Sequence, residues 1–391
     1  MPRSAGFSIV EVLVAMALAL PILASAFTLV RGAQVAFARE GERTDMQQRL
    51  RVAGNAIHEV LSMAGAGPTR GPRKGALGGS MPPVLPFRVG LPADPPGTFN
   101  AASLTVLSVP RTTSPQTVTA APMPARSGSI SVVVGAGCPP GDAACGFSAG
   151  MKVVLMDRTG SYDLFTITGV QGNLLNLRHD MTDTSFTYAA ATAIVEVTAH
   201  TLYLKRDAAT GSRLMRYDVG GSDVAVVDHV VEMTVAYLGE PELPMLTRPV
   251  SDGVGPWTNY APEPPPAGEQ PTAYPPGENC VFQLDANGID SIARLTALAD
   301  RAGATLVELP ASRLTDGPWC PDATSPNRYD ADLFRIRRVD VSLRVESALS
   351  VLRGPAGALF ARAGTARLAE RWLPDLEVRF SVTPRNLSAA R

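Results

Sequence analysis

The sequence predicts an α+β protein in which one long N-terminal helix packs on antiparallel β-structure. Helical periodicity extends well past an apolar N-terminal run, and short segments with period-two alternation then recur between turn residues. The composition includes 35 glycines and 34 prolines in 391 residues, with 6% aromatic residues, which favours a loop-rich β protein over a disordered one. We also expect an extra β meander and an insertion bracketed by a disulfide.

The N-terminal segment contains a nearly uninterrupted apolar run from Val12 to Val30. As a helix this run would extend about 28 Å, close to the roughly 30 Å hydrocarbon core of a bilayer. It can therefore span a membrane once. Pro21 lies within the run and lacks a backbone donor, so we expect a kink or local melting near Ala17 to Pro21.

A single carboxylate, Glu11, stands at the leading edge of this run. Moving a carboxylate into hydrocarbon costs roughly 2.5 to 3.5 kcal/mol on insertion scales, so an intramembrane acid is a functional candidate that needs a partner. Arg3 and the small residue Gly6 come just before Phe7. Cleavage after Gly6 would leave the apolar run in the mature protein, whereas a secretory signal loses its apolar segment on cleavage.

The segment Gly6-Phe7-Ser8-Ile9-Val10-Glu11 resembles the class III signal of type IV pilins and pseudopilins. The resemblance implies that residues 1–6 are a leader, which prepilin peptidase removes between Gly6 and Phe7. It implies that Phe7 becomes an N-methylated terminus and that residues 7–30 are a transmembrane helix. It also implies that Glu11 is the assembly carboxylate, which pairs with the N-terminal amine of a neighbouring subunit.

Two other interpretations of the N-terminus remain open. An ordinary signal anchor would give the same apolar helix but would not require Gly-Phe followed by an acid. A cleavable secretory signal could be cut near Ala24-Ser25-Ala26, although Glu11 would then lie unexplained in its apolar segment.

Beyond Val30 the helical pattern becomes amphipathic, over residues 31–66. Apolar residues recur at spacings of three and four: Met46, Leu50, Ala53, Ile57, Val60 or Leu61, and Ala64. Gly65, Gly67 and Pro68 end the pattern, so we predict one helix from Phe7 to Ala64 whose second half lies against a sheet. Residues 67–100 are rich in Gly and Pro and are interpreted as a linker.

Residues 101–391 are predicted to form a β-rich domain. A first set of strands suggests a small meander or partial barrel: Ser103 to Val109, Ser129 to Val134, Lys152 to Asp157, Asp163 to Val170 and Leu174 to Arg178. A second set follows, with a hairpin turn at Asp207 to Ser212: Ala193 to Lys205, Arg213 to Asp218, Val224 to Leu238, Asp340 to Glu346 and Val378 to Val382.

The second set of strands carries a further resemblance, to PilW-type minor pilins and the related J-type pseudopilins. It covers about half of the globular part and lies in Leu202-Tyr203-Leu204, Leu214 to Tyr217, Val227 to Tyr237, Tyr329 to Val339 and the closing Pro384-Arg385-Asn386-Leu387. Strands of some other β domain would show the same alternation.

An insertion is expected at about residues 239–328, with a proline-rich loop and a helix from about Ile289 to Arg301. Cys280 and Cys320 bracket this helix within the insertion. The chain has four cysteines, Cys138, Cys145, Cys280 and Cys320, and an even number fits an oxidising compartment. Of three possible pairings we prefer the local one, Cys138 with Cys145 and Cys280 with Cys320. A zinc site is the alternative, although no C-x-x-C occurs. The insertion could be a partner-binding surface or a lid over a sheet edge.

Motifs for catalysis are weak. Gly146-Phe147-Ser148-Ala149-Gly150 satisfies G-x-S-x-G, but a nucleophile elbow needs a strand before it and a helix after it, and a strand is expected after this one. Asp285 to Asp290 resembles the start of a calcium loop, but Thr296 occupies the position of the bidentate acid. An Asx-rich turn that caps the following helix is the preferred interpretation of this segment, and a calcium site with other ligands stays open. We expect no enzyme activity and no cofactor, and we assign no metal ligands. The net charge of −1 gives no general attraction to nucleic acid.

The resemblance implies a minor pilin that primes or modifies assembly of a type IV pilus. Its expected partners are prepilin peptidase, other pilin subunits through the N-terminal helix, and the assembly platform in the inner membrane. Before assembly the chain would cross the inner membrane once with its globular domain in the periplasm, and it would then enter the filament. The alternatives are a minor pseudopilin of a type II secretion system and a membrane-anchored periplasmic binding or adhesion module.

Overall fold

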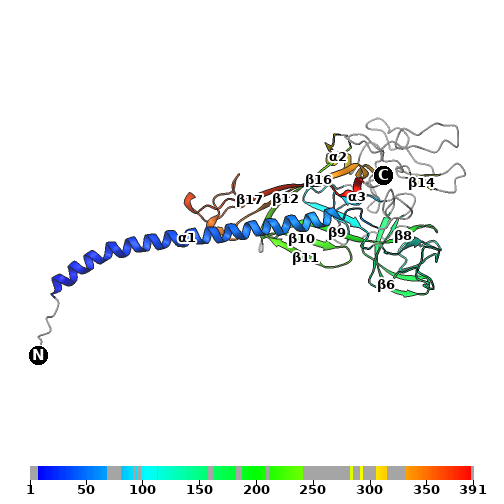
Figure 1. The fold of residues 1–391 in the computed structure, drawn as a ribbon, viewed down its shortest axis with the longest axis horizontal. Helices are drawn as coiled ribbons and strands as arrows, with labels where there is room; N and C mark the ends of the chain where they lie inside the picture. Colours follow the sequence, from blue (N-terminus) through cyan, green and yellow to red (C-terminus); the bar gives the residue numbers. More distant parts are fainter. Residues whose placement is uncertain are drawn as a thin grey trace, which may run out of the picture. The chain divides into compact units, whose positions relative to one another are not determined.

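The computed structural model describes residues 8–67, 81–90, 93–95, 98–111, 113–156, 162–181, 187–207, 211–240, 282–284, 291–293, 305–314 and 331–388. They form an α+β structure with one long helix and antiparallel sheets, as the sequence predicts (Figure 1). The chain divides into two compact units, Met1–Arg51 with Val345–Leu376, and Val52–Arg344 with Glu377–Arg391. The expectations for Gly6, Phe7, Cys280 and Cys320 lie outside the described residues.

The long helix, α1, runs from Ile9 to Ser62, 54 residues without a break. It continues through Pro21, so the expected local melting near that residue is wrong: one lost donor is tolerated while the hydrogen bonds on either side persist. The helix ends where the sequence predicts. Gly65 adopts a left-handed φ of 68°, and its N–H donates to the carbonyl oxygen of Leu107 at 3.0 Å.

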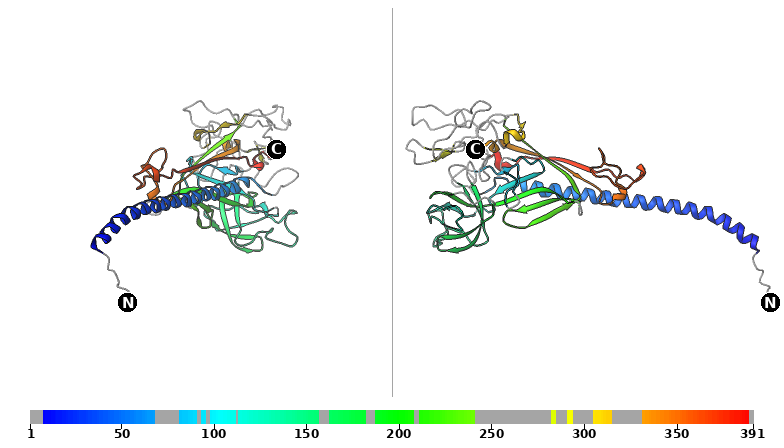
Figure 2. Two further views of the ribbon diagram at one scale, coloured as in Figure 1. Left: turned by 60° about the vertical axis from the view of Figure 1, so that its left-hand side comes forward. Right: turned by 180° about the vertical axis from the view of Figure 1, so that it is seen from behind.

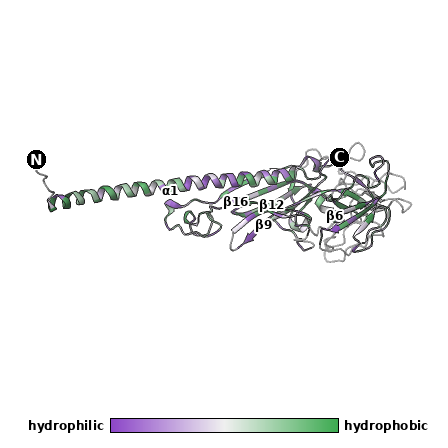
Figure 3. Cartoon of the chain, turned by 90° about the horizontal axis from the view of Figure 1, so that it is seen from below, coloured by the Kyte–Doolittle hydropathy of each residue, from purple (hydrophilic) through white to green (hydrophobic). Residues whose placement is uncertain are grey.

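The two halves of α1 differ in burial. In the first half the large apolar side chains are exposed, from 47% at Val12 to 80% at Ile9. In the second half Met46, Ala53, Ile57 and Leu61 are completely buried. Figure 3 shows mainly hydrophobic residues along the first half of the helix and a mixture of hydrophobic and hydrophilic residues along the second half. The predicted amphipathic stripe is confirmed, with Leu50 half-buried at its margin.

A five-stranded antiparallel sheet has the order β1-β2-β9-β10-β11. Its strands are β1 (Val84–Leu85), β2 (Ser103–Ser108), β9 (Thr198–Asp207), β10 (Gly211–Asp218) and β11 (Asp223–Asp228). Strand β1 and the buried Met81 and Val89 lie within the segment interpreted as a linker, so part of that segment belongs to the core.

A second sheet has the order β15-β12-β16-β17. Its strands are β15 (Val307–Glu308), β12 (Val230–Gly239), β16 (Ile336–Val345) and β17 (Leu376–Val382). The run predicted as one strand over Val224 to Leu238 is divided between β11 and β12, because His229 has a left-handed φ of 62°. The two sheets meet where the N–H of Val235 donates to the carbonyl of Ala101 at 2.8 Å.

The predicted meander is a closed barrel. Six strands follow the order β3-β8-β5-β6-β7-β4, and the outer two are joined through a bridge between Thr119 and Val132. The strands are β3 (Gln116–Val118), β8 (Ala193–Glu196), β5 (Lys152–Met156), β6 (Tyr162–Gln171), β7 (Leu174–His179) and β4 (Ser129–Ser131). The interior contains buried apolar side chains such as Leu155, Phe165 and Ile194.

Three long segments of the chain are inserted between strands that are neighbours in a sheet. The barrel lies between β2 and β9, whose ends pair through Ser108 and Thr198. Residues 240–335 lie between β12 and β16, and residues 346–375 between β16 and β17, which are also neighbours. Such insertions leave the parent sheet intact, because the flanking strands still pair directly. Figure 2 shows the barrel, in teal and green, at the side of the sheets.

The remaining described elements are short: β13 (Phe282–Leu284), β14 (Ser291–Ala293), α2 (Ala311–Leu314), η1 (Ala331–Arg335), η2 (Ser350–Leu352), η3 (Ala369–Arg371) and α3 (Arg385–Ser388). Strands β13 and β14 pair antiparallel. The helix predicted from about Ile289 to Arg301 is therefore wrong over Ser291–Ala293.

Two side chains of the barrel donate hydrogen bonds to the turn between β10 and β11. Lys152 donates through Nζ to the carbonyl of Val219, and Arg178 donates to that of Gly220 at 2.9 Å. The buried carboxylate of Asp180 lies directly beneath Gly220, whose φ is 71°.

We expect Gly220→Ala to lower the free energy of unfolding by about 3 kcal/mol or more, because a Cβ there would overlap the Asp180 carboxylate. Gly172→Ala is the matched control: its φ is 61° and nothing lies within 4 Å of the added Cβ. It should cost only the about 1 to 2 kcal/mol of a left-handed backbone. Urea denaturation measures both, and equal losses would contradict the proposed packing of Asp180 against the turn.

An ion pair between Arg88 and Asp94 stabilises the segment before β2. Arg88 donates to Asp94 through its backbone N–H at 2.9 Å and through Nη2 at 2.7 Å. Burial alone would raise the pKa of Asp94, but hydrogen bonds from Arg88 and Asn100 and the charge of Arg88 together lower it below the usual 3.8.

A carboxyl group with a lowered pKa in the folded chain stabilises the fold above its unfolded pKa, and this contribution is lost as the pH falls through the folded pKa. We therefore expect Asp94→Asn to flatten the loss of stability below about pH 4. Urea denaturation as a function of pH measures this, with Asp45→Asn as the control because Asp45 is 61% exposed. If Asp94→Asn lost stability below about pH 4 as steeply as the parent chain, Asp94 would not be the source of this acid sensitivity.

Candidate functional site

The N-terminal end of α1 is the first candidate site. The backbone N–H of Ser8 donates to Oε2 of Glu11 at 3.0 Å, and the N–H of Val10 donates to Oγ of Ser8 at 3.3 Å. This reciprocal arrangement is a capping box, in which both side chains satisfy N–H groups that lack helical partners. In a single chain, Glu11 therefore caps its own helix. The capping role of Ser8 was not predicted, although the S-x-x-E spacing of Ser8 and Glu11 is visible in the sequence.

The apolar surface that follows Glu11 has no cover within the described residues. The most apolar 18-residue window of α1 is long and apolar enough to cross a membrane, and none of it is buried. This fits a single-pass membrane anchor. Because the window lies near the N-terminus, a signal sequence would meet the same criterion.

Cys138 and Cys145 are joined by a disulfide, the first of the two bonds expected from the sequence. Cys145 and the neighbouring Phe147 are buried in the barrel core, so the bond ties the loop before β5 to the barrel. The G-x-S-x-G motif follows immediately. Ser148 is exposed in a turn, and strand β5 rather than a helix comes next.

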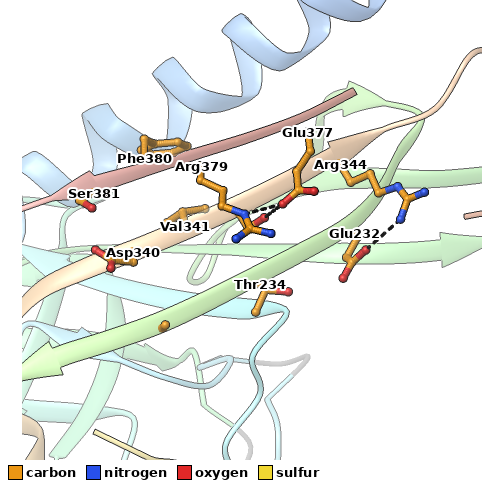
Figure 4. Close-up of a pocket in the computed structure, with 11 residues that line it drawn as sticks. Glu232, Thr234, Asp340, Val341, Arg344, Glu377, Arg379, Phe380 and Ser381 are labelled. Atoms are coloured by element: carbon orange, nitrogen blue, oxygen red, sulfur yellow. Dashed lines mark hydrogen bonds and ion pairs between the residues drawn. The ribbon is translucent and has the colours of Figure 1, made fainter. Parts of the chain in front are cut away.

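The second candidate site is an open groove on the sheet formed by β12, β16 and β17 (Figure 4). It has a volume of about 640 Å³. Alternate residues of the three strands face it: Glu232, Thr234 and Ala236, then Asp340, Ser342 and Arg344, then Glu377, Arg379 and Ser381. No single strand shows this site in the sequence, because it requires the register of three strands separated by long insertions.

Charges in this groove are paired. Arg379 donates to Glu377 through Nε at 2.6 Å, Ser342 donates to the same carboxylate at 3.0 Å, and Arg344 lies 3.9 Å from Glu232. Hydrogen bonds from Arg379 and Ser342 lower the pKa of Glu377. The groove therefore offers fixed charges of both signs to a polar partner. In the part of the chain that is described, no group of three or more His, Cys, Asp or Glu residues could hold a metal ion.

The opposite face of β17 packs on α1. A Cβ placed on Gly54 would lie 3.7 Å from the ring of Phe380, which is ordinary van der Waals contact. Phe380 points to the helix, whereas Glu377 and Arg379 point to the groove (Figure 4). The sheet thus separates an apolar face, covered by helix, from a charged face.

In comparisons with known proteins, no family model matches the chain and no curated protein matches its sequence.

Proposed function

We propose that this chain is a minor pilin that prepilin peptidase cleaves between Gly6 and Phe7 and that enters a type IV pilus, where it primes or modifies assembly. The observation that carries the proposal is α1. It is one continuous helix of 54 residues, with a capped carboxylate at its start, an exposed apolar first half and a second half that covers a sheet. A folded domain needs only the second half, so the first half is available for a membrane and then for other subunits.

In the proposed mechanism Glu11 changes partner. In the free chain its carboxylate accepts a hydrogen bond from the N–H of Ser8. Among bundled apolar helices an unpaired carboxylate would be costly, whereas a carboxylate paired with the amine of Phe7 on a neighbour would not. The pairing would therefore select one axial register between subunits. The methylated terminus at Phe7 and the assembly platform in the inner membrane are part of the same proposal.

The proposed location follows from the anchor and the cysteines. The chain would cross the inner membrane once, with its globular part in the oxidising periplasm. The disulfide between Cys138 and Cys145 supports an oxidising location, because such bonds are rare in the cytosol.

A deletion of prepilin peptidase tests the proposal. The intact mass of the chain should correspond to a methylated N-terminus at Phe7 in the parent strain and to the full leader in the deletion strain. Gly6→Leu should give the uncleaved mass in the parent strain. An N-terminus near Ala24 to Ala26 would show a secretory signal and overturn the proposal, and so would equal masses in both strains.

Two alternatives remain as proposals. A minor pseudopilin of a type II secretion system would use the same helix. A membrane-anchored binding or adhesion module is favoured by a separate observation, the groove with its paired charges on β12, β16 and β17. Co-purification of the chain with sheared pili, with secretion components or with neither distinguishes the three.

A further inference from the structure

The β-barrel is closed by a narrow seam between β3 and β4. One bridge joins Thr119 to Val132, and the N–H of Val133 donates to the carbonyl of Val118 at 2.9 Å. The hydroxyl of Thr117 donates to the carbonyl of Val133 at 2.7 Å. The other neighbouring strands of the barrel pair through three to six residues each. Within the described residues, the seam is therefore the barrel junction with the fewest backbone pairs.

The disulfide between Cys138 and Cys145 holds the chain that leaves this seam. Residues 134–137 follow the seam directly and are exposed. The carbonyl of Gly135 accepts a hydrogen bond from the N–H of Cys138 at 3.0 Å, and its N–H donates to Sγ of Cys138 at 3.3 Å. Cys145 lies in the barrel core with Phe147. The bond is thus a covalent link between the exposed end of the seam and the barrel interior.

The two sulfur-bearing residues differ in accessibility. Cys145 is 2% exposed, whereas Cys138 is only partly buried against the same core. The backbone on both sides of Cys145 is fixed by Asp142, whose carboxylate accepts from the N–H groups of Ala144 and Gly146, each at 2.8 Å. A thiol in solution can therefore reach Cys138 in the folded chain, but it can reach Cys145 only after local unfolding.

We propose that Cys138 is a thiol–disulfide exchange site and that the bond made there holds the barrel seam closed. Its reactants are low-molecular-weight thiols and disulfides, such as reduced and oxidised glutathione. The proposal does not depend on the proposed pilus function. It depends on the unequal exposure of Cys138 and Cys145 and on the position of their bond beside the seam.

The exchange is balanced in both directions. In closure the Cys138 thiolate attacks oxidised glutathione and displaces one glutathione thiolate, and the Cys145 thiolate then attacks Sγ of Cys138 and displaces the second. The chain loses two electrons and two protons, and the glutathione disulfide gains them as two thiols. Opening is the reverse, with the electron pair of the broken bond left on Cys145. A thiolate is disfavoured in the apolar core, so opening is slow and the bond persists in the folded chain.

Mapping of the glutathione adduct on the full chain tests the exchange site. The folded, oxidised chain is incubated with reduced glutathione and quenched with acid, and a protease that cleaves before aspartate separates the two cysteines at Asp142. Mass spectrometry should find glutathione on Cys138 at least about tenfold more often than on Cys145. In urea, which exposes both residues, the two adducts should be equally frequent within about twofold.

Two single variants treated with oxidised glutathione complete this test. Cys145→Ser lacks the resolving thiol and should keep the adduct on Cys138 in the folded chain. The matched control, Cys138→Ser, should be modified on Cys145 only in urea. Equal adducts on the two residues of the folded parent, or an excess on Cys145, would overturn the exchange site. So would a folded Cys145→Ser chain that forms no adduct on Cys138.

Hydrogen exchange tests whether the bond holds the seam closed. The double variant Cys138→Ser/Cys145→Ser lacks the bond without any added reductant. The amides of Ala120 and Val133, which donate across the seam, should exchange faster by up to about fiftyfold. Exchange in β10 of the five-stranded sheet should be unchanged. Unchanged exchange at Ala120 and Val133 would overturn the role in closure, and so would an equal acceleration in β10.

Discussion

Replacement of Glu11 by alanine is expected to abolish incorporation of the chain into filaments while cleavage between Gly6 and Phe7 continues. Removing one partner of a buried ion pair costs about 3 to 5 kcal/mol, which corresponds to a loss of at least about a hundredfold in incorporation. Immunoblots of sheared filaments and of membranes measure incorporation, and the intact mass of the membrane-bound chain measures cleavage.

The capping box provides matched controls for this experiment. Ser8→Ala removes the acceptor for the Val10 N–H but leaves the Glu11 carboxylate, so incorporation should persist. Glu11→Gln keeps an acceptor for the Ser8 N–H and loses the charge, so incorporation should fail. If Ser8→Ala failed as completely as Glu11→Ala, helix capping would explain the defect. Normal incorporation of Glu11→Gln would exclude the proposed charge pairing.

Local patterns predict much of this fold. The stripe of Ala53, Ile57 and Leu61 depends only on helical spacing, and Gly65 ends the helix through its own left-handed backbone. Interactions between distant residues were not predictable in the same way. The barrel closes because Thr119 bridges to Val132, and neither residue differs in pattern from one at an open sheet edge.

Two further differences between the predicted and the observed elements have distinct physical causes. The helix expected from about Ile289 was suggested by local propensity, but Ser291–Ala293 pairs with Phe282–Leu284 and forms β14. Tertiary pairing overrode propensity there. The break at His229 is a left-handed residue inside an alternating apolar run, where a non-glycine residue gives no warning of a turn.

The two candidate sites also differ in whether the sequence alone can reveal them. Glu11 is visible in the sequence because an acid beside an apolar run is unusual, and its partner Ser8 follows from a spacing of three. The groove is not visible, since Glu232, Arg344 and Glu377 lie on three strands and become neighbours only through strand pairing. The hydrogen bond from Arg39 to the carbonyl of Glu370 is likewise not visible in the sequence, because it joins positions 331 residues apart.

A large loss of stability is also expected when Glu346 is replaced, because its carboxylate is completely buried between Arg353 and Arg362. Glu346→Ala should destabilise the segment Val345–Leu376 by about 3 kcal/mol, since it leaves Arg353, only 11% exposed, without its charged partner. We take the lower end of the usual range because Arg362 is 39% exposed and can turn to solvent. Hydrogen exchange of Val345–Leu376 measures the local unfolding of this segment.

A surface carboxylate gives the matched control for Glu346. Glu377 also accepts a hydrogen bond from an arginine, Arg379, but this arginine is 80% exposed. Glu377→Ala should therefore leave hydrogen exchange in Val345–Leu376 unchanged. Equal protection of this segment in Glu346→Ala and in the parent would contradict a stabilising role for the buried carboxylate.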